Sequence, residues 1–230
     1  MAVVRRIPCL VAAVVDHGEH VYTVELEPLA TVPRFVPGQF LHLALDEYDP
    51  GGFWPESRAF SIASSPVERD SLVITYAVKG TFTSRMEREL RRDMRVWVKL
   101  PYGEFVIDAE RDAVLFAGGT GMTAFTAFIG ALRPEQEHAV VVLYGVRNSS
   151  LFIYRDLVER RSREIPRLSY ELLPEDTCGR LSADVVSPRL GEMTAPLFYL
   201  SGPPSMLTAL TKQLRDLGVD RREVRIDAWE

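Results

Sequence analysis

The stretch of sequence that decides the fold is residues 114–124, VLFAGGTGMTA. Its apolar start is typical of a buried strand, and the glycines that follow lead into a segment with helical spacing. Gly119, Gly121 and Ala124 fit the pattern G-x-G-x-x-A. A dinucleotide pyrophosphate requires close backbone amides and a helix N-terminus aimed at it, and a Cβ at either glycine would obstruct that approach. The stretch therefore favours nucleotide binding over its alternative, a tight structural turn.

Downstream of this stretch, short apolar segments alternate with longer amphipathic ones. Such alternation is typical of β-α-β units, whose strands form a parallel sheet. We therefore predict an α/β, Rossmann-like nucleotide domain for residues 109–230. Its strands are predicted at 113–117, 139–145, 168–173, 196–201 and 224–227, and its helices at 122–132, 151–161, 182–186 and 205–217.

Upstream, residues 1–108 are rich in Val, Thr, Phe and Tyr, with frequent Pro and Gly. Several segments alternate as half-buried strands do, and turn residues separate them. Five or six short strands predict a closed antiparallel β-barrel, with one short helix at residues 84–90. The strands are predicted at 7–15, 21–26, 39–45, 60–63, 72–78 and 95–100.

The composition of the 230 residues is that of an ordinary globular protein, with 47% hydrophobic and 26% charged residues. This composition excludes disorder, collagen-like repeats and membrane-spanning bundles. The 27 Lys and Arg against 32 Asp and Glu give a net charge of -5, so nucleic acid is not expected as a partner. The two cysteines, Cys9 and Cys178, provide no disulfide framework or iron–sulfur ligand set, which makes the cytoplasm the expected compartment.

Two motifs near the N-terminus are rejected as functional signals. Arg5 and Arg6 precede the apolar run 7–15 and imitate a secretory signal, but this run is too short to span a bilayer. His17 and His20 have H-x-x-H spacing, but they fall in an expected hairpin turn with no third ligand nearby. Neither a membrane span nor a metal site is therefore expected.

The barrel half contains two segments whose chemistry suits a cofactor. Residues 58–66 are RAFSIASSP, in which an arginine, an aromatic residue and a hydroxyl alternate on a strand. Residues 79–84 are KGTFTS, in which a glycine and several hydroxyls open a helix. Together they suit a flat ring and a pyrophosphate, whereas either segment alone would be ordinary strand and cap chemistry.

In the order and spacing of its motifs, the sequence resembles the ferredoxin-NADP reductase superfamily, in particular compact flavin reductases and oxygenase reductases. The resemblance covers nearly the whole chain. Residues 58–61 resemble the flavin motif R-x-Y/F-S/T, and residues 80–84 resemble the flavin-phosphate segment. The other matches are the barrel-closing turn P-x-G-x-F at 101–105, the nucleotide loop at 118–121, the second nicotinamide segment SGPP at 201–204, and the C-terminal acidic and aromatic residues Asp227 and Trp229.

The resemblance implies FAD in the barrel and NAD(P)H in the second domain, with the substrate meeting the flavin between them. It implies that Arg58 pairs with the flavin pyrophosphate, that Phe60 packs on the ring and that Ser61 hydrogen-bonds near N5, which accepts the hydride. The other implied flavin contacts are Ala59, Tyr76, Lys79, Gly80, Thr81, Phe82, Thr83 and Ser84. The implied NAD(P)H contacts are Gly119, Thr120, Gly121, Arg147, Gly202 and Pro203. The residues expected at the hydride-transfer centre are Ser61, Ser201, Asp227 and Trp229.

The choice between NADH and NADPH stays open. An acidic residue after the second strand would mark a free ribose hydroxyl, but residues 144–150, YGVRNSS, contain no acid. Arg147 and the serines could hold a 2′-phosphate. Alternatively, Arg147 is a solvated loop residue, and Ser149 or Ser150 caps the next helix.

The implied activity is that of a reductase that passes electrons from NAD(P)H through flavin N5 to an acceptor. The acceptor would be a ferredoxin-, haem- or oxygenase-type protein or a small molecule. A second hypothesis is a flavin-holding relay or sensor subunit without its own NAD(P)H turnover. Two observations keep it open: the family often has cysteine where Ser201 stands, and Trp229 either stacks on the flavin or is a frayed terminal residue. A third is a coenzyme-binding enzyme without flavin, which would require the barrel motifs to be coincidental.

Overall fold

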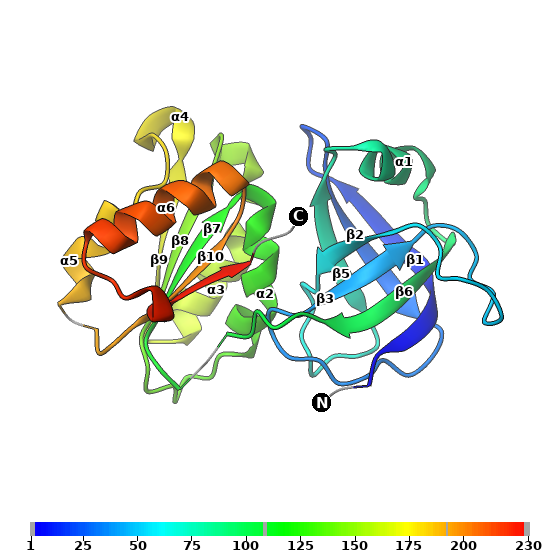
Figure 1. The fold of residues 1–230 in the computed structure, drawn as a ribbon, viewed down its shortest axis with the longest axis horizontal. Coiled ribbons are helices and arrows are strands. Elements are labelled where there is room, and N and C mark those ends of the chain that lie inside the picture. Colours follow the sequence, from blue (N-terminus) through cyan, green and yellow to red (C-terminus); the bar gives the residue numbers. More distant parts are fainter. Residues whose placement is uncertain (1–2, 108–109, 192, 228–230) are drawn as a thin grey trace. The chain divides into compact units, whose positions relative to one another are not determined.

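The computed structural model describes residues 3–107, 110–191 and 193–227 (Figure 1). The chain divides into two compact units, residues 1–106 and 107–230. The predicted domain boundary, between residues 108 and 109, lies outside the described residues. The predicted fold class is confirmed, with an antiparallel barrel in the first unit and a parallel sheet with helices in the second.

The first unit is a six-stranded antiparallel sheet with the strand order β4-β3-β6-β1-β2-β5. The sheet is nearly closed, because the backbone N–H of Ala63, just after β4, donates to the carbonyl of Val73 on β5 at 2.8 Å. The strands are β1 (Arg5–Asp16), β2 (Val21–Pro28), β3 (Phe40–Ala44), β4 (Ser57–Ser61), β5 (Leu72–Ala77) and β6 (Arg95–Tyr102).

The period-two alternation of these strands fills the barrel with apolar side chains. Ile7, Cys9 and Val11 of β1 are buried, as are Val96 and Val98 of β6. Because alternate side chains point to opposite faces of a strand, the residues between them lie on the outer wall. The barrel therefore presents a second, outward-facing set of side chains along the same strands.

Helix α1 (Thr81–Glu89) packs Phe82 and Met86 against the barrel core. It begins three residues before the predicted start at residue 84, because Gly80 acts as the N-cap and its carbonyl accepts the N–H of Ser84 at 2.9 Å. Residues 81–83, which precede the predicted start, therefore form its first turn.

The second unit is a five-stranded parallel sheet with the order β11-β10-β7-β8-β9. The chain builds β8 and β9 on one side of β7 and then crosses to build β10 and β11 on the other. This reversal beside β7 makes a topological switch point, where ligands of such sheets bind at the carboxyl ends of the strands. The strands are β7 (Ala113–Gly118), β8 (Val140–Val146), β9 (Leu168–Pro174), β10 (Leu197–Ser201) and β11 (Val224–Asp227).

Helices cover both faces of this sheet, with α6 in front of it and α2 and α3 behind it in Figure 1. Leu207, Leu210 and Leu214 of α6 pack against Val114 and Phe116 of β7. The α-helices are α2 (Thr123–Ala131), α3 (Arg155–Glu164), α4 (Glu175–Cys178), α5 (Ser187–Leu190) and α6 (Pro204–Asp216). The 3-10 helices are η1 (Gly119–Met122), η2 (Ser149–Leu151), η3 (Ala183–Val186) and η4 (Arg221–Glu223).

Two predicted helices have a different form. The segment predicted as a helix at 151–161 opens with the 3-10 turn η2, so α3 begins only at Arg155. The segment predicted at 182–186 is the 3-10 helix η3. None of the helices in the described part of the chain has the length and apolar character needed to span a bilayer.

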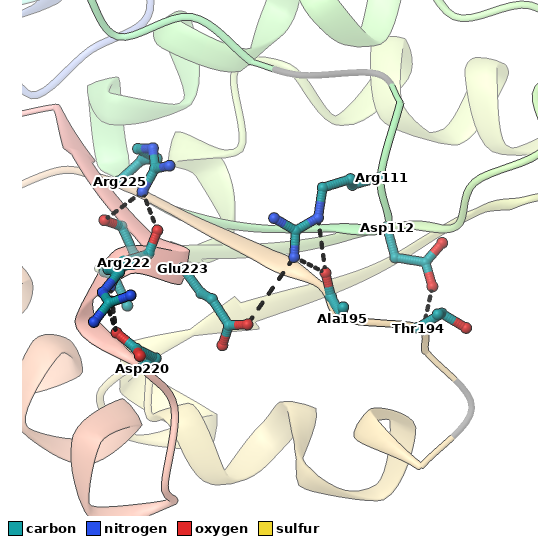
Figure 2. Close-up of polar contacts among 9 residues, drawn as sticks. Arg111, Asp112, Thr194, Ala195, Asp220, Arg222, Glu223 and Arg225 are labelled. Atoms are coloured by element: carbon teal, nitrogen blue, oxygen red, sulfur yellow. Dashed lines mark hydrogen bonds and ion pairs between the residues drawn. The ribbon is translucent and has the colours of Figure 1, made fainter.

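Polar contacts hold the amino-terminal end of the sheet together (Figure 2). The carboxylate of Asp112 accepts the backbone N–H of Ala139 at 2.8 Å and that of Thr194 at 2.6 Å. The Arg111 guanidinium donates to the carbonyl of Ala195. These contacts lie at the end of the sheet opposite to the carboxyl ends of the strands, where the switch point beside β7 predicts ligand binding.

Candidate functional site

In the first unit, the structure brings Arg58 of β4 to the beginning of helix α1. The Arg58 guanidinium lies 5.3 Å from the centre of the Phe82 ring, which belongs to the first turn of that helix. It also forms an exposed ion pair with Glu56 at 3.2 Å. A cation thus stands beside a helix N-terminus, and both features attract phosphate oxygens.

The loop that enters α1 is organised by Thr83. The hydroxyl of Thr83 accepts the backbone N–H of Lys79 at 2.9 Å and that of Gly80 at 3.1 Å, and it donates to the carbonyl of Gly80. This hydroxyl therefore shapes the loop. The first N–H groups of the helix, which have no intrahelical acceptor, are what the helix can offer to a phosphate.

Tyr76 of β5 is buried with an unsatisfied hydroxyl. Its oxygen has no hydrogen-bond partner among the described residues, and its side chain is 3% exposed. The Tyr76 ring stacks on Tyr22 with a centroid distance of 5.5 Å and lies 6.1 Å from the ring of Phe60. Burial raises the pKa of the Tyr76 phenol, so the group stays a protonated donor. An unpaired donor beside Phe60 fits the polar edge of a bound ring.

The predicted flavin contacts on β4 divide between two faces of the strand. Arg58 and Phe60 lie on the face that meets Phe82 and the barrel core. Ala59 and Ser61 lie on the alternate face, and both are half-buried. The structure thus groups Arg58, Phe60, Tyr76 and Phe82 with the loop at residues 79–84, and it holds Ser61 on the adjacent face.

Arg85, in the second turn of α1, is held by two carboxylates. Its guanidinium donates to Asp46 at 2.8 and 2.5 Å and to Glu89 at 3.0 and 2.9 Å. This network neutralises the positive charge of Arg85. Arg58 is therefore the stronger candidate for a phosphate ligand.

In the second unit, the glycine loop after β7 has two different steric requirements. Gly119 adopts a φ of +55°, and no described residue lies within 4 Å of a Cβ built there. Gly121 is packed internally, because a Cβ at this position would overlap the carbonyl of Ser201. Close packing against the end of β10 is therefore sufficient to require glycine at position 121, whereas the approach of a pyrophosphate to this residue stays a prediction.

The second glycine segment, after β10, lies against the first. A Cβ at Gly202 would be 3.0 Å from the Cα of Gly118, and a Cβ at Gly118 would overlap the sulfur of Met206. Pro203 is the N-cap of α6 and its carbonyl accepts the N–H of Met206 at 2.9 Å. The structure thus brings the predicted nucleotide segments together, and it adds Met206, which motif spacing alone did not single out.

Two residues expected at the hydride-transfer centre meet at the carboxyl ends of β10 and β11. Ser201 and Asp227 are register partners, and the Ser201 hydroxyl donates to the Asp227 carboxylate at 2.9 Å. Their side chains are 2% and 4% exposed. A buried carboxylate needs hydrogen-bond donors, so this pair is a structural unit as well as a candidate site. Trp229 lies outside the described residues.

Arg147 follows β8, at the same edge of the sheet, and its side chain is exposed. Its carbonyl accepts the N–H of Asp176 at 3.2 Å. The alternative in which Ser149 or Ser150 caps the next helix does not hold, because Asn148 is the N-cap of η2 and its side chain accepts both the N–H and the hydroxyl of Ser150.

The two histidines of the H-x-x-H motif have separate partners. The β1–β2 turn gives positive φ to residues 18–20, and His20 Nδ1 lies 2.7 Å from a Glu87 oxygen. His17 Nε2 lies 2.9 Å from the Thr23 hydroxyl. The motif therefore serves the hairpin and its contact with α1.

Comparison with known proteins places these residues in context. A family model described as an oxidoreductase NAD-binding domain matches residues 115–212. The toluate 1,2-dioxygenase electron transfer component of Pseudomonas putida is 27% identical over 80% of this chain and 56% of its own length. The tetrachlorobenzoquinone reductase of Sphingobium chlorophenolicum is 27% identical over 87% of this chain and 60% of its own length. The chain thus spans a little over half the length of these relatives.

Solved structures share the fold of both units. A cytochrome P450 reductase from Amycolatopsis superposes with a TM-score of 0.82 at 20% identity, covering 99% of this chain and 70% of that one. The FAD/NAD-binding domain of a nitric oxide dioxygenase from Vibrio cholerae gives a TM-score of 0.77 at 19% identity, covering 97% and 98% of the two chains.

Proposed function

We propose that the chain, whose sequence and fold are similar to those of reductases of the ferredoxin-NADP reductase superfamily, is an FAD-dependent NAD(P)H oxidoreductase. In this proposal, residues 1–108 hold FAD, residues 109–230 hold NAD(P)H, and a hydride passes from nicotinamide to flavin N5. The observation that carries the proposal is that each unit brings a glycine-containing loop together with the N-terminus of a helix, α1 with Arg58 in the first unit and α6 in the second.

FAD fits the features of the first unit. Arg58 and the N-terminus of α1 would hold its phosphates, and Phe60 would pack on its ring. The buried hydroxyl of Tyr76 would donate to a polar atom of the ring, which would remove the cost of an unpaired donor. When bound, the flavin accepts two electrons at once and releases them singly or in pairs.

NAD(P)H fits the features of the second unit. Gly119 leaves open space for a pyrophosphate, and α6 starts beside it with Pro204 at its first turn. The hydroxyl proton of Ser201 is committed to Asp227, so the Ser201 oxygen would accept a hydrogen bond, as from the amide N–H of a nicotinamide. Asp227 would thus position Ser201, and Arg147 would contact the adenosine end.

The electron acceptor is proposed from the relatives. Their names include an electron transfer component of a dioxygenase and a quinone reductase. We therefore infer a ferredoxin-, haem- or oxygenase-type protein, or a small acceptor such as a quinone. A cytoplasmic location remains a prediction.

The visible spectrum of the purified protein tests the proposal, recorded before and after anaerobic addition of NADH and of NADPH to separate samples. We expect yellow protein that one coenzyme bleaches. Yellow protein that neither coenzyme bleaches would indicate a flavin-holding relay or sensor subunit instead. Protein that stays colourless with added FAD would overturn the flavin assignment.

A further inference from the structure

The outer wall of the barrel contains a recess that the proposed function does not use. Its volume is about 550 Å³, within the range of small-molecule sites. It lies where the loop after β3 folds over β1 and β6. None of its lining residues is among the predicted flavin or nucleotide contacts. They include Arg5, Arg6, Tyr48, Trp97, Lys99 and Tyr102.

The pairing of β1 with β6 explains why these side chains share one face. Arg6 is the register partner of Lys99, and Trp97 is two residues from Lys99 on the same strand. Their neighbours Ile7 and Val98 are buried in the barrel core. Because side chains alternate across a strand, Arg6, Trp97 and Lys99 point to the outer wall together.

Two of the three cations that line this recess, Arg6 and Lys99, lie over aromatic rings. The Arg6 guanidinium lies 5.4 Å from the centre of the Tyr48 ring. The Lys99 ammonium lies 5.2 Å from the centre of Tyr102 and 5.4 Å from that of Trp54. Within the described part of the chain, no carboxylate pairs with Arg6 or Lys99, in contrast to Arg85. In a protein with a net charge of -5, this is a local concentration of unneutralised positive charge.

The aromatic wall is ordered by its own contacts. Tyr48 is 8% exposed and meets Trp97 edge to face at 5.5 Å. Trp54 donates its indole N–H to Ser57 at 2.9 Å, and Asp49 accepts the N–H of Gly51, so the loop is held in place over the strands. A preformed wall of this kind binds a flat ring with little cost in conformational freedom.

We propose that this recess binds a small planar aromatic anion. Its ring would lie against Tyr48, Trp97 and Tyr102, and its carboxylate or phosphate would lie between Arg6 and Lys99. Arginine binds such groups through two parallel hydrogen bonds, and each of them is charge-assisted. An inorganic anion would interact only with the cations, and a neutral ring would pack only on the aromatic side chains. A ligand that combines an aromatic ring with a negative charge would therefore bind most tightly.

Isothermal titration of the flavin-loaded protein with phenyl phosphate, benzoate, inorganic phosphate and benzyl alcohol tests this proposal. We expect one site per chain for phenyl phosphate or benzoate, bound at least about tenfold more tightly than inorganic phosphate or benzyl alcohol. The aromatic anion that binds more tightly shows whether the recess prefers a phosphate or a carboxylate. If neither aromatic anion binds more tightly than inorganic phosphate, the proposal is overturned.

The affinities of substitution variants for the aromatic anion test whether it binds at this recess. Arg6→Gln and Lys99→Gln should each weaken the aromatic anion by about tenfold. Arg95→Gln removes the same charge from an exposed position of β6 that does not line the recess, and it should leave the affinity unchanged. Arg6 is exposed, so its variant folds even if the half-buried Lys99 variant does not. An equal loss of affinity in Arg95→Gln would show that the anion is attracted by charge in general, and it would overturn the proposed site. Bleaching of the flavin by NAD(P)H is measured separately and reports on the proposed function alone.

Discussion

The two candidate cofactor regions are built on different physical principles. The barrel region relies on side-chain chemistry. Arg58 supplies a positive charge, Tyr76 supplies a hydrogen-bond donor, and Thr83 holds the loop that leads into α1. The parallel-sheet region relies on backbone shape, since Gly118 and Gly121 allow two loops to meet. Mutations in the barrel region should therefore lower ligand affinity and leave stability unchanged, whereas substitution of the packed glycines in the parallel-sheet region should lower stability.

The largest expected effect comes from Gly121→Ala. The new Cβ would overlap the carbonyl of Ser201, so the loops after β7 and β10 must separate. We expect the second unit to lose about 3 kcal/mol of unfolding free energy, measured by denaturant unfolding. Gly130→Ala, within α2 with no described residue within 4 Å of the new Cβ, is the matched control and should stabilise by up to about 1 kcal/mol. Equal effects at the two glycines would contradict the packing argument.

The next largest effect is expected from Asp227→Ala, which removes the hydrogen bond between Ser201 and Asp227. The Ser201 hydroxyl would lose its acceptor and its fixed orientation. Because a hydrogen bond to a charged group contributes roughly 1.5–3 kcal/mol, flavin reduction by NAD(P)H should slow by about 10- to 100-fold in rapid-mixing experiments. Flavin content should stay unchanged. The double variant with Ser201→Ala should be little slower than the single variants, because the two residues act as one unit. Additive losses would show that they act independently.

Arg58→Gln separates binding from folding in the barrel. The change removes the cation beside the N-terminus of α1. FAD affinity should fall by about tenfold or more in titrations of the apoprotein, while the unfolding free energy changes by less than about 0.5 kcal/mol. Arg92→Gln, an exposed arginine between α1 and β6, is the control. A stability loss that exceeds the affinity loss would place Arg58 in the scaffold.

The smallest expected effect is that of Tyr76→Phe. Removing a buried hydroxyl that has no hydrogen-bond partner among the described residues should leave the apoprotein unchanged or stabilise it by up to about 1 kcal/mol. FAD should bind a few-fold more weakly to the variant. Differential scanning calorimetry with and without FAD separates the two effects, and a variant with unchanged FAD affinity would exclude the hydroxyl as a flavin donor.

Much of the fold followed from periodicity, because alternating and continuous apolar segments report burial directly. Helix starts were harder to predict, since they depend on single capping contacts, such as the carbonyl of Gly80 or the side chain of Asn148. The meeting of Ser201 and Asp227 depends on the register of parallel strands, which sequence spacing does not give.

The remaining features required three-dimensional neighbours. The packing role of Gly121 and the unpaired Tyr76 hydroxyl depend on residues far away in the chain. The outer recess depends on the pairing of Arg6 with Lys99. No short-range pattern signals such pairs, because each residue alone looks like an ordinary strand position.

The central claim is that a nicotinamide held by the second unit reduces a flavin held by the first. Anaerobic single-turnover reduction by NADH and by NADPH, followed on wild type and Asp227→Ala with equal FAD content, tests it most directly. The account predicts rapid bleaching of wild type by one coenzyme and bleaching of the variant that is slower by about tenfold or more. Flavin that neither coenzyme reduces, or equal rates in the two proteins, would contradict it.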